Sequence, residues 1–145
     1  MLKRLLTVVA TTAAMSAPVA AQDERTMLSI VSTGDAQTQL MAMVLTLQTA
    51  SQGVKPRILL CGPAGDIALA DAPAAATAGQ PPRDASPQGL MRRLMDQADA
   101  TVEVCAIYLP GRGEDASVLI EGVGVADPDE IGALIANPAT RVIGF

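Results

Sequence analysis

Short continuous apolar runs alternate along the chain with longer stretches whose apolar residues recur every three to four positions. The first apolar run, near 27–32, predicts a strand. The stretch that follows has Leu40, Val44 and Leu47 at helical spacing, and Gly53 lies where a helix C-cap glycine is expected. The beginning of this pattern therefore predicts a strand followed by a helix.

The middle of the sequence repeats this order. An apolar run near 56–61 predicts a second strand, and the Ala-, Pro- and Gly-rich segment 71–85 lacks periodicity, which is typical of a long, mobile loop. Ser86 and Pro87 form a favourable helix start, because serine caps a helix and proline suits its first position. The apolar run 101–109, which contains a cysteine, predicts the third strand.

The last third contains weaker signals and one strong helix start. The letters "SVLIEG" predict a short helical turn, "GVGVA" a short fourth strand and "TRVIGF" the last strand. Asp127 is followed three residues later by Glu130, which is the arrangement of a capped helix N-terminus. We expect that helix to stop before Pro138, because proline cannot continue it.

The order of these elements predicts the fold class. Strands that alternate with helices indicate an α/β protein with a parallel sheet covered on both faces, and the continuous apolar runs agree with this. We expect a three-layer α/β/α sandwich around a five-stranded parallel sheet. Ligands bind such sheets at the carboxyl ends of the strands. Cys61 and Cys105 both lie late in, or at the end of, a predicted strand.

The N-terminus has the three parts of a bacterial signal peptide. Basic "MLKR" precedes apolar "LLTVVATTAAM", and "APVAAQDE" places Val19 and Ala21 at the −3 and −1 positions of a cleavage site before Gln22. The apolar run is shorter than the roughly 20 residues that a membrane span requires. We therefore expect a signal peptide over 1–21, a mature periplasmic domain over 22–145, and no membrane association after cleavage.

Composition excludes several classes of function. The formal net charge is −5, and the single Tyr and single Phe offer no stacking surface, so nucleic acid is not an expected partner. The chain has no histidine, which excludes Ser-His and Cys-His catalysis and histidine-based zinc hydrolysis.

The glycine-containing letters "GPAGDIAL" lack the lysine and hydroxyl of a phosphate-binding loop. Methionines without histidine favour core packing over copper binding, and no dissociable cofactor is implied.

The two cysteines are the remaining candidates for chemistry. An exported protein holds paired cysteines as a disulfide by default. A hydrophobic fraction of 50% can build a core without a disulfide scaffold. From the residues alone, Cys105 is either an inert core thiol or a nucleophile.

Four segments carry a resemblance to a known family: "RILLCGPAGDIAL", "GLMRRLMDQADATVEVCAIYLPGRG", "LIEGVGVADPDEIGALI" and "RVIGF". Together they resemble the DsrE/DsrF-like family, which includes sulfur-relay subunits of the TusD type. The resemblance covers nearly the whole mature chain and implies the α/β/α fold and assembly into a homo-oligomer. Cys105 falls where the sulfur-transferring members carry their persulfide-forming cysteine, whereas Cys61 matches no catalytic position of the relay proteins.

The resemblance implies a sulfur carrier or thiol-redox protein with a sulfur donor or acceptor protein as its partner. Cys105 would be the nucleophile, Arg112 and the following turn would stabilise its thiolate, and 71–85 would be a possible flap. If the second and third strands are neighbours, Cys61 would resolve a persulfide or sulfenate on Cys105. A structural disulfide and two separate buried thiols remain alternatives, as do a non-catalytic binding module and an oligomeric accessory subunit.

Overall fold

A computed structural model describes residues 25–145, and the predicted signal peptide over 1–21 lies outside these described residues. The chain forms a five-stranded sheet in which every pairing is parallel, with the order β4-β3-β2-β1-β5. The strands are β1 (Thr26–Val31), β2 (Lys55–Leu60), β3 (Thr101–Val104), β4 (Gly124–Val125) and β5 (Thr140–Gly144). The predicted five-stranded parallel α/β fold is confirmed.

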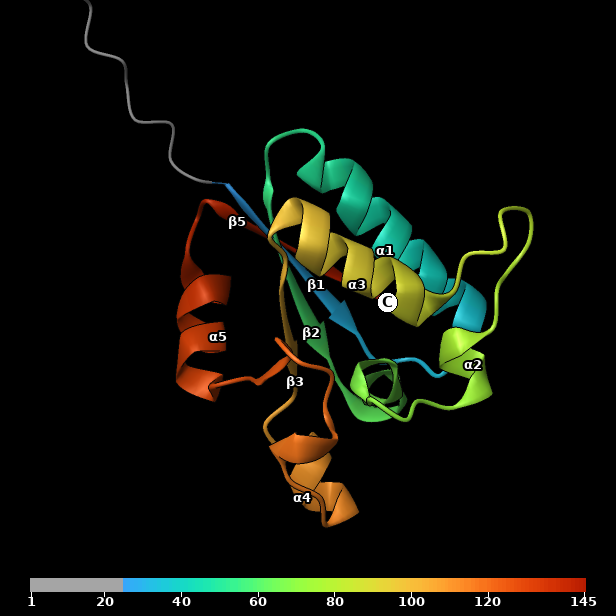
Figure 1. Cartoon of the computed structure of the whole chain (residues 1–145). Helices are drawn as coiled ribbons and strands as arrows, with labels where there is room; N and C mark the ends of the chain where they lie inside the picture. The colour runs from blue at the N-terminus through green and yellow to red at the C-terminus, as the bar shows by residue number, and fades with distance from the viewer. Residues whose placement is uncertain (1–24) are drawn as a thin grey trace, which may run out of the picture.

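The helices lie on both faces of the sheet (Figure 1). Helices α1 (Ala36–Ala50) and α3 (Pro87–Ala98) pack side by side on one face, and α5 (Pro128–Ala136) covers the other. The strand order explains this arrangement, because successive steps from β1 to β2 to β3 run in one direction, and right-handed crossovers then place both connecting helices on one face. The return from β4 to β5 runs in the opposite direction, so α5 lies on the opposite face.

Successive side chains along each strand point to opposite faces of the sheet, so the core consists of two layers. Ile58 and Leu60 of β2 belong to the larger cluster, which α1 and α3 cover. Leu59 belongs to the smaller cluster, which also contains Ile131 of α5. Successive residues of a strand point to opposite faces, so the residue after Leu60 faces the α5 side.

The expected caps form at the longer helices. The Ser86 side chain accepts a hydrogen bond from the Gly89 N–H at 3.1 Å, and the Asp127 side chain accepts one from the Asp129 N–H at 2.8 Å. Asp35 caps α1 in the same way, and the hydrogen bond from the Thr38 hydroxyl lowers the pKa of its carboxyl. Such caps each contribute about 1 kcal/mol to helix stability.

The prediction of one strand over 101–109 was wrong in its second half. β3 ends at Val104, the Cys105 carbonyl accepts a hydrogen bond from the Tyr108 N–H at 2.8 Å, and helix α4 (Tyr108–Arg112) begins there. Pro110 lies within the first turn of α4. Proline is tolerated there because the first N–H groups of a helix have no partner within it.

The segment 71–85, predicted to be a loop without regular structure, contains a helical turn, α2 (Ala74–Thr77), in which Ala76 is buried. Gln80 and Ala85 form an isolated antiparallel bridge beyond it. A buried alanine and paired backbone groups give this alanine-rich segment local structure that periodicity does not reveal. The chain also forms two 3-10 helices, η1 (Gly62–Ala68) and η2 (Ala116–Val118). The second overlaps only the first two residues of the helical turn predicted for 117–122.

Candidate functional site: a disulfide at the carboxyl edge of the sheet

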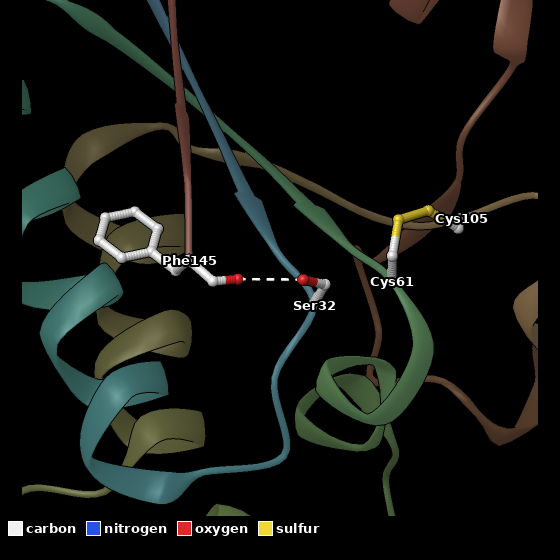
Figure 2. Close-up of a disulfide and its surroundings, with 4 residues drawn as sticks. All are labelled: Ser32, Cys61, Cys105 and Phe145. Carbon is white, nitrogen blue, oxygen red and sulfur yellow. Dashed lines mark hydrogen bonds between the residues drawn. A yellow bond between two sulfur atoms is a disulfide. The ribbon is translucent and has the colours of Figure 1, made fainter.

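Cys61 and Cys105 form a disulfide, and their Cα atoms are 5.1 Å apart (Figure 2). The sheet register explains the pairing. Leu60 of β2 is aligned with Val104 of β3, so the two residues that follow them are also aligned. The Cys105 N–H donates to the Leu60 carbonyl at 2.9 Å, which extends the parallel pairing to the cysteine itself. The condition set in the sequence analysis, that β2 and β3 are neighbours, is therefore met.

The disulfide lies at the edge of the sheet where parallel strands end and ligands commonly bind. Both cysteines are partly buried and pack against the cluster of the α5 face. Figure 2 shows the disulfide beside the end of β1, where the Ser32 hydroxyl donates to the Phe145 carbonyl at 3.1 Å. Neither cysteine belongs to the fully buried core, so the bond is close to the surface.

Each cysteine is followed by a short helix, and a side-chain hydrogen bond joins the two helices. Tyr108 of α4 donates its hydroxyl proton to Asp66 Oδ1 of η1 at 2.6 Å. We call this pair, with Arg112, the clasp. Burial raises the pKa of the Tyr108 hydroxyl, and the hydrogen bond to Asp66 raises it further. The clasp therefore connects the segments on the carboxyl side of both cysteines by a contact that does not depend on the disulfide.

Gly65 makes room for the clasp. The ring of Tyr108 lies directly against Gly65, and a Cβ atom at this position would overlap three ring atoms. Gly65, the second glycine of the "GPAGD" letters, therefore serves the packing of an aromatic ring. This agrees with the absence of the lysine and hydroxyl that a phosphate-binding loop needs.

Arg112 lies at the clasp. Its guanidinium Nε donates to Glu114 Oε2 at 2.6 Å, its Nη1 donates to Asp66 Oδ1 at 3.3 Å, and its Cζ is 5.4 Å from the centre of the Tyr108 ring. Among residues 25–145, every hydrogen bond and ion pair of the Arg112 side chain is to one of these two carboxylates. Stabilisation of a Cys105 thiolate by Arg112 stays a prediction, because the structure contains the oxidised pair.

An apolar groove adjoins the disulfide. A cavity of about 350 Å³ lies between α5 and the segment that follows β3. Its lining, which defines the apolar groove, consists of Leu59, Cys105, Ala106, Ile107, Ala126, Pro128, Ile131, Gly132 and Ile135. Sequence reasoning missed this feature, although a large apolar residue two positions after a candidate nucleophile was a visible signal.

An ion pair between Glu103 and Arg57 lies on the same face of the sheet as Cys105. Glu103, two residues before Cys105 and therefore on the same side of the strand, is 9% exposed. Its Oε2 accepts from Arg57 Nη2 at 2.7 Å and from Nε at 2.9 Å, and Arg57 also reaches Glu130 of α5 at 3.4 Å. The guanidinium compensates the buried carboxylate, so Glu103 is a structural partner of Arg57 and not a free general base.

Other kinds of site have little support in the described part of the chain. Residues 25–145 contain no group of three or more His, Cys, Asp and Glu side chains placed to hold a metal ion. Over the same residues, none of the helices combines the length and hydropathy of a membrane span.

Comparison with known proteins supports the fold. No family model matches the sequence, and no curated protein is significantly similar to it. Among solved structures, the YchN protein from E. coli matches with a TM-score of 0.65 and 18% identity, over 84% of this chain and 99% of YchN. A protein of unknown function from Methanobacterium thermoautotrophicum matches with a TM-score of 0.61 and 16% identity, over 85% of this chain and all of that one. Both neighbours have the DsrE-like fold, and the chain described here has the same fold.

Proposed function

We propose that the protein is a periplasmic thiol–disulfide exchange protein in which Cys61 and Cys105 cycle between disulfide and dithiol. The observation that carries this proposal is the disulfide itself, at the carboxyl edge of the sheet and next to an apolar groove that includes Cys105. A disulfide that only staples a core has no need of an adjoining groove. Export after removal of 1–21 would place the pair in a compartment where disulfides persist.

The exchange reaction proceeds in two steps. A partner thiolate attacks the Cys105 sulfur, forms a mixed disulfide with it and releases Cys61 as the thiolate, which takes up a proton from solvent. A second partner thiolate then attacks the partner sulfur of the mixed disulfide and releases Cys105 as the thiolate. The partner loses two electrons and gains a disulfide, and the Cys61–Cys105 pair gains both electrons. The reverse sequence reduces a partner disulfide.

Two features of the structure favour these roles. Cys105 lines the groove and Cys61 does not, so we assign the attacked sulfur to Cys105 and the leaving group to Cys61, which follows the neighbouring strand. The clasp between Tyr108 and Asp66 keeps the two cysteine-bearing segments together after the bond opens. A dithiol held in this way re-forms its disulfide without a search for its partner.

Sulfur transfer is the second candidate, and the DsrE-like fold favours it. In the reduced protein, the Cys105 thiolate attacks the outer sulfur of a persulfide donor and forms a Cys105 persulfide, and the donor leaves as a thiolate. The Cys61 thiolate can then attack the inner sulfur, which forms the observed disulfide and releases hydrosulfide. Mass spectrometry after polysulfide treatment of the reduced Cys61→Ser variant tests this route, because that variant cannot resolve the persulfide. A gain of one sulfur that is absent when Cys105→Ser is added supports it, and no gain contradicts it.

The equilibrium between disulfide and dithiol tests the proposed function. The protein is equilibrated with glutathione buffers of graded potential, alkylated and weighed, while its circular dichroism is recorded. We expect a reversible two-electron transition in a folded protein at a potential above about −300 mV, because structural disulfides of secreted proteins lie below that value. A pair that stays oxidised throughout, or a protein that unfolds on reduction, contradicts redox cycling and supports the structural alternative. A homo-oligomer and a donor or acceptor partner remain predictions of the resemblance.

A further inference from the structure

The apolar groove has two walls, and Cys105 belongs to one of them. Ala106 and Ile107 continue from Cys105 and form one wall, and Ile131 and Ile135 of α5 form the other. No charged residue is part of the lining. Cys105 is thus flanked by an apolar surface, although the chain as a whole carries a net charge of −5.

Two isoleucines at the groove are unusually exposed. Ile107 is 81% exposed, the largest value among the exposed large apolar residues described, and Ile135 on the facing helix is 49% exposed. Neither belongs to a core cluster of the described chain. The fold does not require an isoleucine at position 107, because the backbone of Ile107 serves as the N-cap of α4 without a side-chain capping hydrogen bond. An apolar partner that covers both side chains would remove them from water.

We propose that the apolar groove binds an extended segment of a partner protein in which a cysteine adjoins bulky apolar and basic residues. The bound segment places its thiol at Cys105, so the groove selects the substrates of the exchange reaction. This inference rests on the proposed function and names the class of partner that the site recognises.

The lining and its surroundings identify a peptide and not a small molecule. Small-ligand sites combine an apolar pocket with a few polar groups that fix the ligand. The apolar groove has no such polar side chain, because every side chain in its lining is apolar. Outside the lining, the exposed residues Asp129 and Glu130 follow Pro128 in the first turn of α5, and Glu130 also contacts Arg57 at 3.4 Å. A partner with lysine or arginine next to its apolar residues complements that charge, whereas a second copy of this acidic chain would be repelled.

Two synthetic peptides of equal charge and one cysteine each test the groove. In the first, leucines flank the cysteine and lysines end the peptide; in the second, serines replace the leucines. The second-order rate constant for attack on the Cys61–Cys105 disulfide is measured for both peptides and for dithiothreitol. We expect the leucine peptide to react at least about tenfold faster than the serine peptide, because apolar burial at the groove lowers the free energy of its transition state.

Substitutions in the groove show whether its isoleucines cause the faster reaction of the leucine peptide. Ile107→Ala and Ile135→Ala should each reduce the ratio of the leucine-peptide rate to the serine-peptide rate several-fold. Ile143→Ala on β5 is the matched control, because it removes the same atoms from an exposed isoleucine outside the groove lining. That control should retain the full preference for leucine.

The outcomes separate the two proposals. Equal rates for both peptides, or a leucine preference that survives both groove substitutions, would overturn the groove proposal while ready reduction by dithiothreitol leaves the exchange function intact. A wild-type protein that self-associates and dissociates on Ile107→Ala would also overturn it, because a second copy would then occupy the groove. Failure of dithiothreitol to reduce the folded protein would instead contradict the exchange function itself.

Discussion

Tyr108 donates a hydrogen bond to Asp66 at 2.6 Å across 42 positions of sequence, and it joins the two short helices that directly follow the disulfide-bonded cysteines. The Arg112 guanidinium lies over the same ring and reaches the same carboxylate. The oxidised pair is therefore held by two independent connections, one covalent and one non-covalent. Because the hydrogen bond between Tyr108 and Asp66 involves no sulfur atom, we expect it to remain when the disulfide is reduced, as the proposed redox cycle requires.

Substitution Tyr108→Phe should weaken the clasp without a change of ring packing. It leaves the Asp66 carboxylate without its hydroxyl donor, and we expect a loss of about 1 kcal/mol in the free energy of unfolding. The loss should be measurable by urea denaturation of both the oxidised and the reduced protein. A variant as stable as the wild type in both states would show that the clasp contributes nothing to holding the segments together.

Substitution Gly65→Ala should be destabilising because the added methyl group overlaps the Tyr108 ring. Overpacking of this kind costs about 1–3 kcal/mol. Gly132→Ala in α5 is the matched control, since nothing lies within 4 Å of its Cβ position and alanine favours a helix. The midpoint temperature of thermal unfolding should therefore be lower than that of the wild type for Gly65→Ala and higher for Gly132→Ala. Equal midpoints would contradict the packing described for Gly65.

The pKa of Tyr108 predicts how stability depends on alkaline pH. Burial and the hydrogen bond to Asp66 raise the folded-state pKa of this hydroxyl above its unfolded value near 10. The folded state then holds the proton more tightly, so its contribution to stability is complete below about pH 10 and is lost as pH rises above that value. Because the chain contains one tyrosine and no tryptophan, the tyrosinate absorbance reports on Tyr108 alone.

In this titration the folded protein should ionise at a higher pH than the unfolded protein in urea. The Asp66→Asn variant is the control, because it keeps an oxygen acceptor and removes the charge that opposes ionisation. It should titrate at a lower pH than the wild type. Coincident folded and unfolded titrations would contradict the buried, hydrogen-bonded hydroxyl.

Loss of the disulfide should destabilise the protein without unfolding it. The two cysteines are 44 residues apart, and a cross-link of this span stabilises by about 4 kcal/mol through the entropy of the unfolded chain. Domains of this size have unfolding free energies of about 5–15 kcal/mol, so the reduced protein should stay folded. Urea denaturation of Cys61→Ser with Cys105→Ser should show a lower midpoint and a native circular dichroism spectrum before the transition.

Much of the fold could be predicted from the sequence because its signals are local. The continuous apolar runs placed β1 and β2 within one residue of their observed bounds, and the caps at Ser86 and Asp127 marked the starts of α3 and α5. Both cysteines were placed late in, or at the end of, a strand. Whether they meet stayed open, because the strand order that brings β2 beside β3 is a tertiary property.

The rest of the site depends on contacts that no local pattern encodes. The apolar letters after Cys105 suit a strand and a buried helical turn equally well, and the tertiary burial of Tyr108 and Leu109 favours the helix. The apolar groove exists only because α5 returns across the sheet to face Ile107. The contact between Arg112 and Asp66 joins residues distant in sequence, whereas the expected role of Arg112 beside a Cys105 thiolate stays a prediction.

The most direct test of thiol–disulfide exchange at Cys105 is to identify which sulfur a thiol attacks in the native protein. The oxidised protein is mixed briefly with glutathione, quenched with an alkylating reagent and mapped by peptide mass spectrometry. Attack on Cys105 predicts glutathione on Cys105 and the alkyl group on Cys61. Glutathione on Cys61 with alkylated Cys105, or no adduct on the folded protein at all, would contradict it.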